Sequence, residues 1–227
     1  MPPFRPLVVL ACAALLAAGV IGSLDAQPTR AQLGFTTAAS DRLIELYSQR
    51  FGQAAAERLH AWKRYARTRG AVPGTERDLL DEVNRVLNRI AFVDDAVHWG
   101  EEDYWATPAE SVASNGADCE DYTIAKYFLL KELGVPIARL RMTYVKSVKL
   151  NQAHMVLAYY ARPDADPVVL DNLEERVRPA SQRTDLIPVY SFNDEEVWVE
   201  MKGRSGSPQQ IRNWSALIAR LERERRT

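Results

Sequence analysis

The apolar pattern of this chain changes near Pro136 from a helical period to a strand period. Before that point, apolar residues recur every three or four positions over residues 41–69, 75–90 and 119–133. After it come five short segments that are alternating or continuously apolar, as strands are: 139–145, 153–160, 167–171, 186–190 and 195–201. Helices followed by strands predict an α+β fold, in which N-terminal helices pack on an antiparallel sheet.

Several helix boundaries can be predicted from local signals. Residues 41–69 can form one long helix or two helices broken near Gly52. A capping-box pattern at residues 75–78 begins a second amphipathic helix. Thr107, followed by proline and then by glutamate at the third helical position, begins a short helix. A final helix is expected over about 208–224, with a frayed, charged tail.

The N-terminus predicts a secretory signal peptide over residues 1–26. Arg5 precedes a small and apolar run, residues 7–22, and polar sequence follows Ala26. The run is shorter than the roughly 20 residues of a membrane-spanning helix, so a retained anchor is the less favoured alternative, as is lipidation at Cys12. Residues 27–227 are then one exported domain, with a core over about 40–200.

Composition narrows the class of partner. A 227-residue chain with 47% hydrophobic and 26% charged residues is typical of a single globular domain. The formal net charge of −1, without a basic stripe, gives no reason to expect nucleic acid as a partner. His60 and His98 have no neighbouring thiol or second histidine that would suggest a zinc site, so we interpret both as structural.

Removal of the signal peptide leaves Cys119 as the only cysteine of a chain exported to an oxidising compartment. A turn signal, Asn115-Gly116, precedes it, and the helix that it begins is ended by Gly134 and Pro136. The positive end of a helix dipole stabilises a thiolate, which favours a nucleophile. The alternative is a small buried residue that opens a core helix.

A partner for this thiol is expected on the strands, where a hairpin carries His154 and Asp171. If Tyr160 pairs with Ala165, the register places His154 directly opposite Asp171, close enough for the carboxylate to hold an imidazole N–H. A slip of one residue would put the two side chains on opposite faces.

The segments NGADCEDYTIAKYFLLKELGVP, AHMVLAYY and VLDNL, together with Trp105, resemble the bacterial transglutaminase-like cysteine proteinases, and closely the LapG-type periplasmic proteases. The resemblance covers about residues 40–200. It implies a papain/transglutaminase-like fold in which Cys119 is the nucleophile, His154 the general base and Asp171 the residue that orients the base. Peptide hydrolysis through a thioester is the reaction it implies.

Three carboxylates flank the thiol: Asp118, Glu120 and Asp121. Their charge should raise the thiol pKa against the helix dipole, and an opposing cation would resolve that conflict. Oxygen ligands suit Ca²⁺, and the resemblance implies calcium at these positions. The alternative is that acidic residues simply favour the first turn of a helix.

The resemblance thus implies a periplasmic, calcium-dependent cysteine endopeptidase. Its substrate would be the N-terminal region of a large LapA-like surface adhesin, cut to release cells from a biofilm. A LapD-like inner-membrane receptor for cyclic di-GMP would regulate it. Two alternatives remain open: a transglutaminase-like thiol acyltransferase, and a non-catalytic binding module with an inert thiol.

Overall fold

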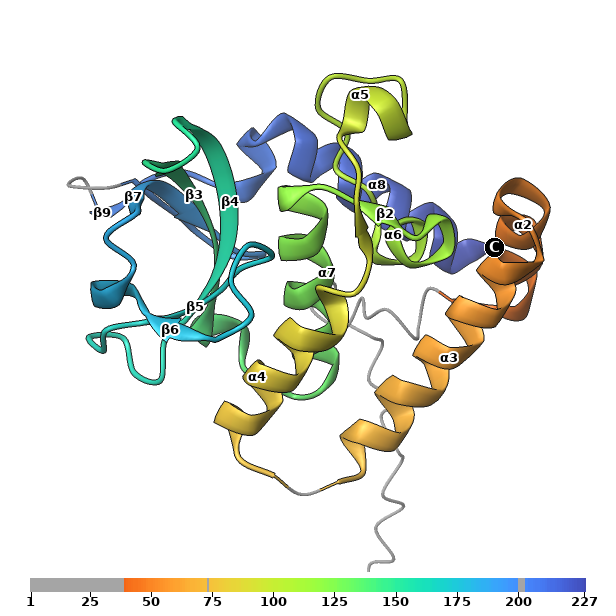
Figure 1. Cartoon of the computed structure of the whole chain (residues 1–227), viewed down its shortest axis with the longest axis horizontal. Coiled ribbons are helices and arrows are strands. Elements are labelled where there is room, and N and C mark those ends of the chain that lie inside the picture. Colours follow the sequence, from red (N-terminus) through yellow and green to blue (C-terminus); the bar gives the residue numbers. More distant parts are fainter. Residues whose placement is uncertain (1–38, 73, 200–202) are drawn as a thin grey trace, which may run out of the picture.

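Helices and strands occupy separate sides of the molecule, with helix α7 (Cys119–Glu132) between them (Figure 1). The computed structural model describes residues 39–72, 74–199 and 203–227. The predicted α+β class is confirmed. The expected signal peptide lies outside the described residues. Among the helices of the described residues, none has the length and apolar character that a membrane crossing needs.

The sheet has seven strands, and every neighbouring pair in it is antiparallel. Its order is β6-β5-β4-β3-β7-β8-β9. The strands are β3 (Leu140–Ser147), β4 (Gln152–Tyr159), β5 (Val168–Leu170), β6 (Arg178–Pro179), β7 (Leu186–Phe192), β8 (Val197–Val199) and β9 (Gly203–Arg204). A separate parallel pair joins β1 (Ala91–Phe92) to β2 (Gly116–Ala117), just before α7.

The remaining elements are helical. The α-helices are α2 (Asp41–Phe51), α3 (Gln53–Gly70), α4 (Glu76–Leu87), α5 (Asp95–His98), α6 (Pro108–Ser114) and α8 (Arg212–Arg226). Single 3₁₀ turns are η2 (Ile137–Arg139), η3 (Ala180–Gln182) and η4 (Pro208–Gln210).

Helix boundaries follow the predicted local signals. The first helical segment is broken into α2 and α3 at Gly52, whose φ of +86° is a conformation that favours glycine. Thr75 and Thr107 both form capping boxes, with Asp78 and Glu110 at the third helical positions. These caps satisfy backbone N–H groups that a helix start leaves without partners.

Helix α7 is surrounded on nearly all sides. It packs against β3 and β4 on the sheet side and against α4 and α6 on the helical side. Tyr127, Phe128 and Leu130 are at most 1% exposed, and Phe128 stacks on Trp214 of α8. Close packing of this kind leaves the helix little freedom to move, so the fold fixes the position of the cysteine at its N-terminus.

The prediction of a frayed C-terminal tail was wrong, because α8 continues to Arg226. Glu224, in its last turn, is 7% exposed, and its Oε1 accepts hydrogen bonds of 2.5 Å from Tyr47 Oη and from Thr107 Oγ1. Within the charged C-terminal residues, Glu224 therefore faces inward and links α8 to α2 and to the N-terminus of α6.

Candidate active site

His154 of β4 and Asp171 after β5 form a buried pair. His154 Nε2 lies 2.8 Å from Asp171 Oδ1, and the two residues are 3% and 1% exposed. The predicted register was wrong by two residues, since Tyr159 pairs with Val168 and Leu157 with Leu170. The loop between the strands is longer than expected. A shift of two keeps both side chains on the same face, so they still meet, although not directly opposite each other.

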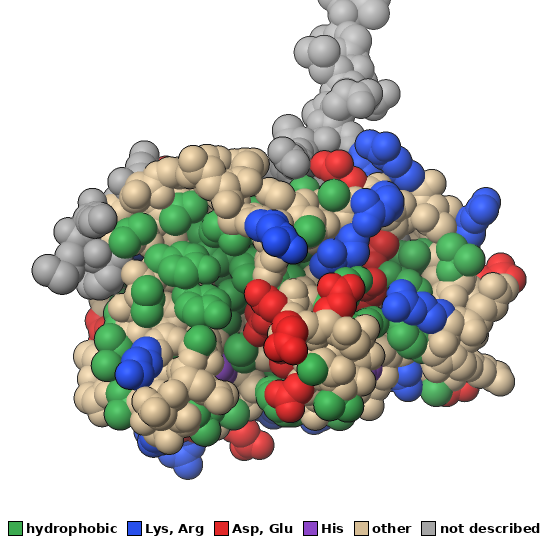
Figure 2. All heavy atoms as spheres, turned by 90° about the horizontal axis from the view of Figure 1, so that it is seen from above, with side chains coloured by type: hydrophobic (Ala, Val, Ile, Leu, Met, Phe, Trp, Pro, Cys, Tyr) green, Lys and Arg blue, Asp and Glu red, His purple; other side chains and the backbone are tan. Residues whose placement is uncertain are grey.

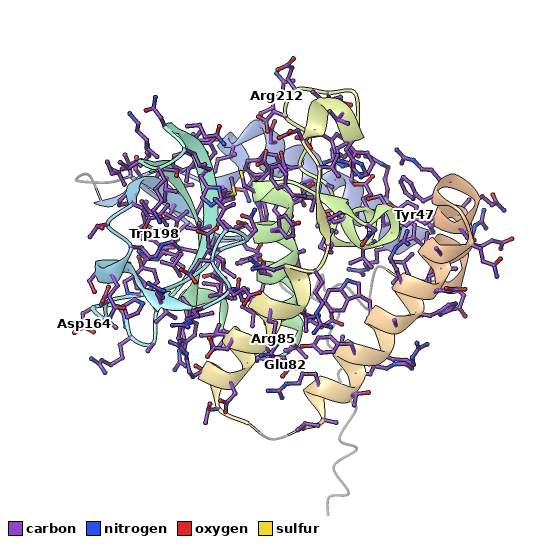
Figure 3. All side chains as sticks on the ribbon, viewed as in Figure 1. Tyr47, Glu82, Arg85, Asp164, Trp198 and Arg212 are labelled. Carbon is purple, nitrogen blue, oxygen red and sulfur yellow. The ribbon has the colours of Figure 1, made fainter. Side chains whose placement is uncertain are left out.

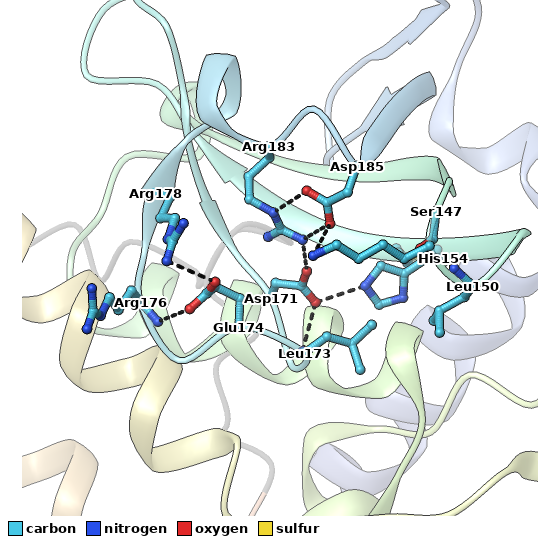
Figure 4. A network of polar contacts seen from close by, with 12 residues as sticks. Ser147, Leu150, His154, Asp171, Leu173, Glu174, Arg176, Arg178, Arg183 and Asp185 are labelled. Atoms are coloured by element: carbon cyan, nitrogen blue, oxygen red, sulfur yellow. Dashed lines mark hydrogen bonds and ion pairs between the residues drawn. The ribbon is translucent and has the colours of Figure 1, made fainter.

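Arg183, which follows η3, completes the environment of Asp171 (Figure 4). Its Nη2 donates to Asp171 Oδ2 at 2.7 Å, and the backbone N–H of Leu173 donates to Oδ1 at 3.0 Å. Burial opposes the charge of Asp171, but His154, Leu173 and Arg183 together outweigh it and hold the pKa of this carboxyl well below its usual range. Sequence reasoning missed Arg183, because only the fold brings it to Asp171.

Cys119 is the first residue of α7, as predicted, and it is a free thiol. Its Sγ donates to Glu120 Oε2 at 2.9 Å. Within the described part of the chain, no hydrogen bond joins this sulfur to His154. Thr123 Oγ1 bridges the two elements that carry them, since it donates to the carbonyl oxygens of Cys119 and of Met155 at 2.9 and 3.0 Å.

The electrostatics of the thiol differ from the simple dipole expectation. Burial, followed by the charges of Glu120 and Asp118, raises the pKa of Cys119 well above its usual range. The helix dipole is therefore not enough to produce a thiolate beside these carboxylates. A cation that offsets the charge of these carboxylates would favour deprotonation of Cys119.

Three carboxylates gather beside the thiol: Asp95, Asp118 and Glu120. Oxygen atoms from all three lie within 4.8 Å of one another. Burial and mutual repulsion raise the pKa of Asp118 to about 10, and burial raises that of Asp95 to about 6. Oδ1 of Asp95 and Oδ1 of Asp118 are buried without a hydrogen-bond partner among the described residues. Unpaired, buried carboxylate oxygens of this kind fit a hard cation such as Ca²⁺.

The two predicted ligands Asp118 and Glu120 are thus brought together, whereas Asp121 is not part of this group. Asp121 is fully buried, and its Oδ1 accepts a hydrogen bond of 2.6 Å from the backbone N–H of Ala106. Asp95 takes the third place. It was missed because it lies 24 residues before Cys119, and only the β1–β2 pairing brings its segment next to the start of α7.

One face of the molecule has an apolar hollow. Seen from above, acidic side chains gather beside it (Figure 2). Tyr144 of β3 stacks on Tyr190 of β7, with ring centroids 5.3 Å apart. Burial, then the charges of Glu120 and Cys119, raise the pKa of Tyr144. A surface of this kind can receive the side chains of an extended peptide.

The chain matches known proteins over most of its length. The family model described as bacterial transglutaminase-like cysteine proteinase matches residues 51–206. Calcium-bound LapG of Legionella pneumophila is 38% identical, with a TM-score of 0.68, and the match covers 80% of this chain and 98% of that one. EGTA-treated LapG of the same organism is 37% identical, with a TM-score of 0.70, and the match covers 80% of this chain and 96% of that one.

A search of curated proteins gave no match. The family match nevertheless spans well over half of the chain, and the solved relatives are covered almost completely. By sequence and by fold, this chain belongs to the bacterial transglutaminase-like cysteine proteinase family.

Proposed function

We propose that this protein is an exported, calcium-dependent cysteine endopeptidase in which Cys119, His154 and Asp171 carry the chemistry. One observation supports the proposal above the others. Thr123 Oγ1 bonds the carbonyl oxygens of Cys119 and of Met155, which ties the start of α7 to the strand that carries the buried His154–Asp171 pair. Membership of a cysteine proteinase family agrees with this assignment.

His154 and Asp171 act on the thiol proton. Cys119 Sγ attacks the carbonyl carbon of the scissile peptide bond, and its proton passes to His154, which returns it to the leaving amine. Water then hydrolyses the thioester, with His154 as the base. Asp171 holds the imidazole in one orientation, since its Oδ1 bonds His154 Nε2. The backbone N–H of Cys119, at the start of α7, is positioned as one donor to the oxyanion.

Asp95, Asp118 and Glu120 are the residues that would hold calcium, a metal that the solved Legionella relative binds. A bound ion supplies positive charge that offsets these carboxylates and favours the thiolate. Glu120 matters most, because its Oε2 accepts the thiol hydrogen bond. Asp121, which the sequence also suggested as a ligand, instead positions the backbone at Ala106.

The substrate and setting extend the likeness to LapG. We propose that the chain carries a signal peptide over residues 1–26, and that residues 27–227 act as one domain in the periplasm. The substrate is the N-terminal region of a large LapA-like adhesin, whose cleavage promotes release from a biofilm. A LapD-like inner-membrane receptor that binds cyclic di-GMP sequesters the protease. The apolar hollow with acidic side chains beside it suits an extended segment of such a substrate (Figure 2).

Alkylation of Cys119 tests the thiol chemistry without a substrate. Iodoacetamide labelling of the mature protein would be followed against pH, in calcium and in EGTA, with His154→Ala as the control. We expect fast labelling at pH values below the pKa of a free cysteine, roughly 8.5, only with calcium and only with His154 present. Slow labelling under every condition would indicate an inert thiol and a binding module.

Cleavage of an adhesin fragment tests the reaction. A purified N-terminal fragment of a LapA-like adhesin is incubated with the calcium-loaded protein, and the products are sequenced. A product with a free new amino terminus is expected for hydrolysis. A product joined to an added amine would instead identify an acyltransferase.

A further inference from the structure

We propose that the sheet face opposite α7 carries a binding site for an amphipathic carboxylate, and that this site shares Arg183 with the His154–Asp171 pair. The site is a cavity of about 470 Å³. Nothing in the proposed protease chemistry uses it.

The cavity belongs to a second, smaller core. Val145, Val156 and Val169, from three adjacent strands, form a buried cluster of their own, against which Ala180 and Leu186 pack. Their alternate neighbours, such as Met155 and Leu157, belong to the main core that contains α7. Side chains of a strand alternate between its two faces, so the second cluster lies on the face away from α7. Trp198, which also lines the cavity, lies on that side of the sheet (Figure 3).

Two arginines supply the charge of the cavity. Among the described residues that line it, Arg141 and Arg183 are the only charged ones. The Arg141 guanidinium lies 4.2 Å from the ring centroid of Tyr160 and 4.0 Å from that of Trp198. Its Nε is buried without a hydrogen-bond partner in the described part of the structure. Cation–π contact leaves N–H groups at the edge of the guanidinium free to bind an acceptor.

Arg183 carries the second unpaired donor. The residue is 7% exposed, and its Nε and Nη2 bond Asp185 and Asp171 (Figure 4). Nη1 is buried and has no partner among the described residues. A buried N–H without an acceptor is unfavourable, so this guanidinium, at the wall of the cavity, lacks one of its hydrogen bonds.

These features define the chemistry of the ligand. Valine side chains and the indole of Trp198 favour an apolar body. Two guanidinium groups at the wall of an otherwise uncharged cavity favour a carboxylate head. The volume lies within the range of pockets that enclose a small molecule, roughly 300–1,000 Å³. A small alkyl or aryl carboxylate therefore suits the site better than a folded partner.

Arg183 links this cavity to the proposed active site. Its Nη2 donates to Asp171 Oδ2 at 2.7 Å, and Asp171 in turn holds His154. An anion at Nη1 and the carboxylate of Asp171 compete for one positive charge. Binding and the state of Asp171 must therefore be coupled, and the coupling is reciprocal. This step depends on the geometry of Asp171 and not on its proposed catalytic role.

Calorimetric titration of the calcium-loaded mature protein, residues 27–227, with decanoate tests the site, with decan-1-ol as the neutral counterpart. We expect decanoate to bind the wild type and to lose at least about tenfold in affinity in Arg141→Met, the usual scale for a lost charge-assisted bond. Thr143→Trp, which fills the cavity from β3, should abolish binding. Circular dichroism melts establish that both variants fold.

Equal decanoate affinity in the wild type and in folded Thr143→Trp would overturn the site, because the ligand would then bind elsewhere. Equal affinity for decanoate and decan-1-ol would overturn the role of the arginines. For the coupling, Asp171→Asn should bind decanoate severalfold more tightly, and unchanged or weaker affinity would refute it. All of these readouts are binding constants, so a failure here is distinct from a failure of the proposed protease activity.

Discussion

The carboxylates of the proposed active site have two opposite environments. Asp171 is surrounded by donors and cations, with His154, Arg183 and the Leu173 N–H at its two oxygens. Its pKa is held well below the usual range despite burial. Asp118, by contrast, faces other acids, and burial raises its pKa to about 10.

The difference shows which part of the site is complete in the polypeptide alone. The chain supplies every partner that Asp171 needs, so the histidine–aspartate pair is organised by folding. Asp95, Asp118 and Glu120 lack a cation among the described side chains and leave buried oxygens unpaired. Their charge must be balanced by protons or by a metal ion. The proposed calcium dependence then concerns one side of the site only.

The largest effect is expected from a change on the organised side of the site, which is the His154–Asp171 pair with Arg183. Asp171→Asn removes the charge that fixes the His154 imidazole, and we expect hydrolysis of the adhesin fragment to fall by about 10³–10⁴-fold, as for the equivalent change in a serine protease triad. The stabilisation by calcium, measured as the shift in melting temperature between calcium and EGTA, should be unchanged. A large loss of that shift would mean that the two regions are not independent.

Neutralising residues on the acidic side of the site, which is Asp95, Asp118 and Glu120, should give the next largest effect. Asp118→Asn combined with Glu120→Gln should abolish the calcium-induced rise in melting temperature and reduce hydrolysis by about 10²–10³-fold, because the thiol loses its counter-cation. The same variant should be more stable than the wild type in EGTA. An unchanged response to calcium would show that the ion binds elsewhere.

The stability gain has a defined pH dependence. Burial raises the pKa of Asp118 above its unfolded value, so the group costs stability above roughly pH 4, where the unfolded chain is ionised. At pH 7 in EGTA, the double variant should gain about 2 kcal/mol in the free energy of unfolding, and below roughly pH 4 the gain should disappear. Urea unfolding at the two pH values measures it.

Arg183 offers a smaller change on the organised side. Arg183→Met leaves His154 and Asp171 in contact but removes the cation at Asp171 Oδ2. We expect hydrolysis to fall by about tenfold to a hundredfold, on the scale of a residue that supports a site residue rather than reacting itself. Arg183→Lys keeps the charge without the forked geometry and should recover part of the rate. Equal rates in both variants would indicate a purely structural role.

The organised side was easier to predict from sequence than the acidic side. His154 and Asp171 are on consecutive strands, and side-chain alternation brings them together even though the predicted register was wrong by two residues. The start of α7 at Cys119 was correct because turn, proline and glycine signals are local. The prediction of calcium came from the family resemblance.

Residues brought in from distant segments could not be predicted in this way. Asp95 reaches the thiol through the β1–β2 pair, and Arg183 reaches Asp171 through η3. Neither has a local pattern that distinguishes it from an exposed charged residue. The inward turn of Glu224 was missed for the same reason, since four of the five residues around it in the tail are charged.

Glu224 is a third kind of buried carboxyl. It lies outside the group of candidate metal ligands, and hydroxyl groups bond one of its oxygens. Oε1 accepts from Tyr47 and Thr107, whereas Oε2 has no partner among the described residues. Burial raises its pKa to about 7. The folded chain therefore loses stability as pH rises from about 4.5 to 7, because the unfolded chain releases the proton first.

Glu224→Gln retains an acceptor for both hydroxyls and removes the charge. We expect it to raise the free energy of unfolding by about 1–2 kcal/mol at pH 8 and to have no such effect near pH 4. Asp164→Asn, a change in an exposed loop carboxylate, serves as the matched control and should show no pH-dependent gain (Figure 3). Urea unfolding in EGTA at both pH values makes the measurement. If Glu224→Gln were instead destabilising at pH 8, the two hydroxyl bonds would require the carboxylate, and Glu224 would belong with Asp171 rather than with Asp118.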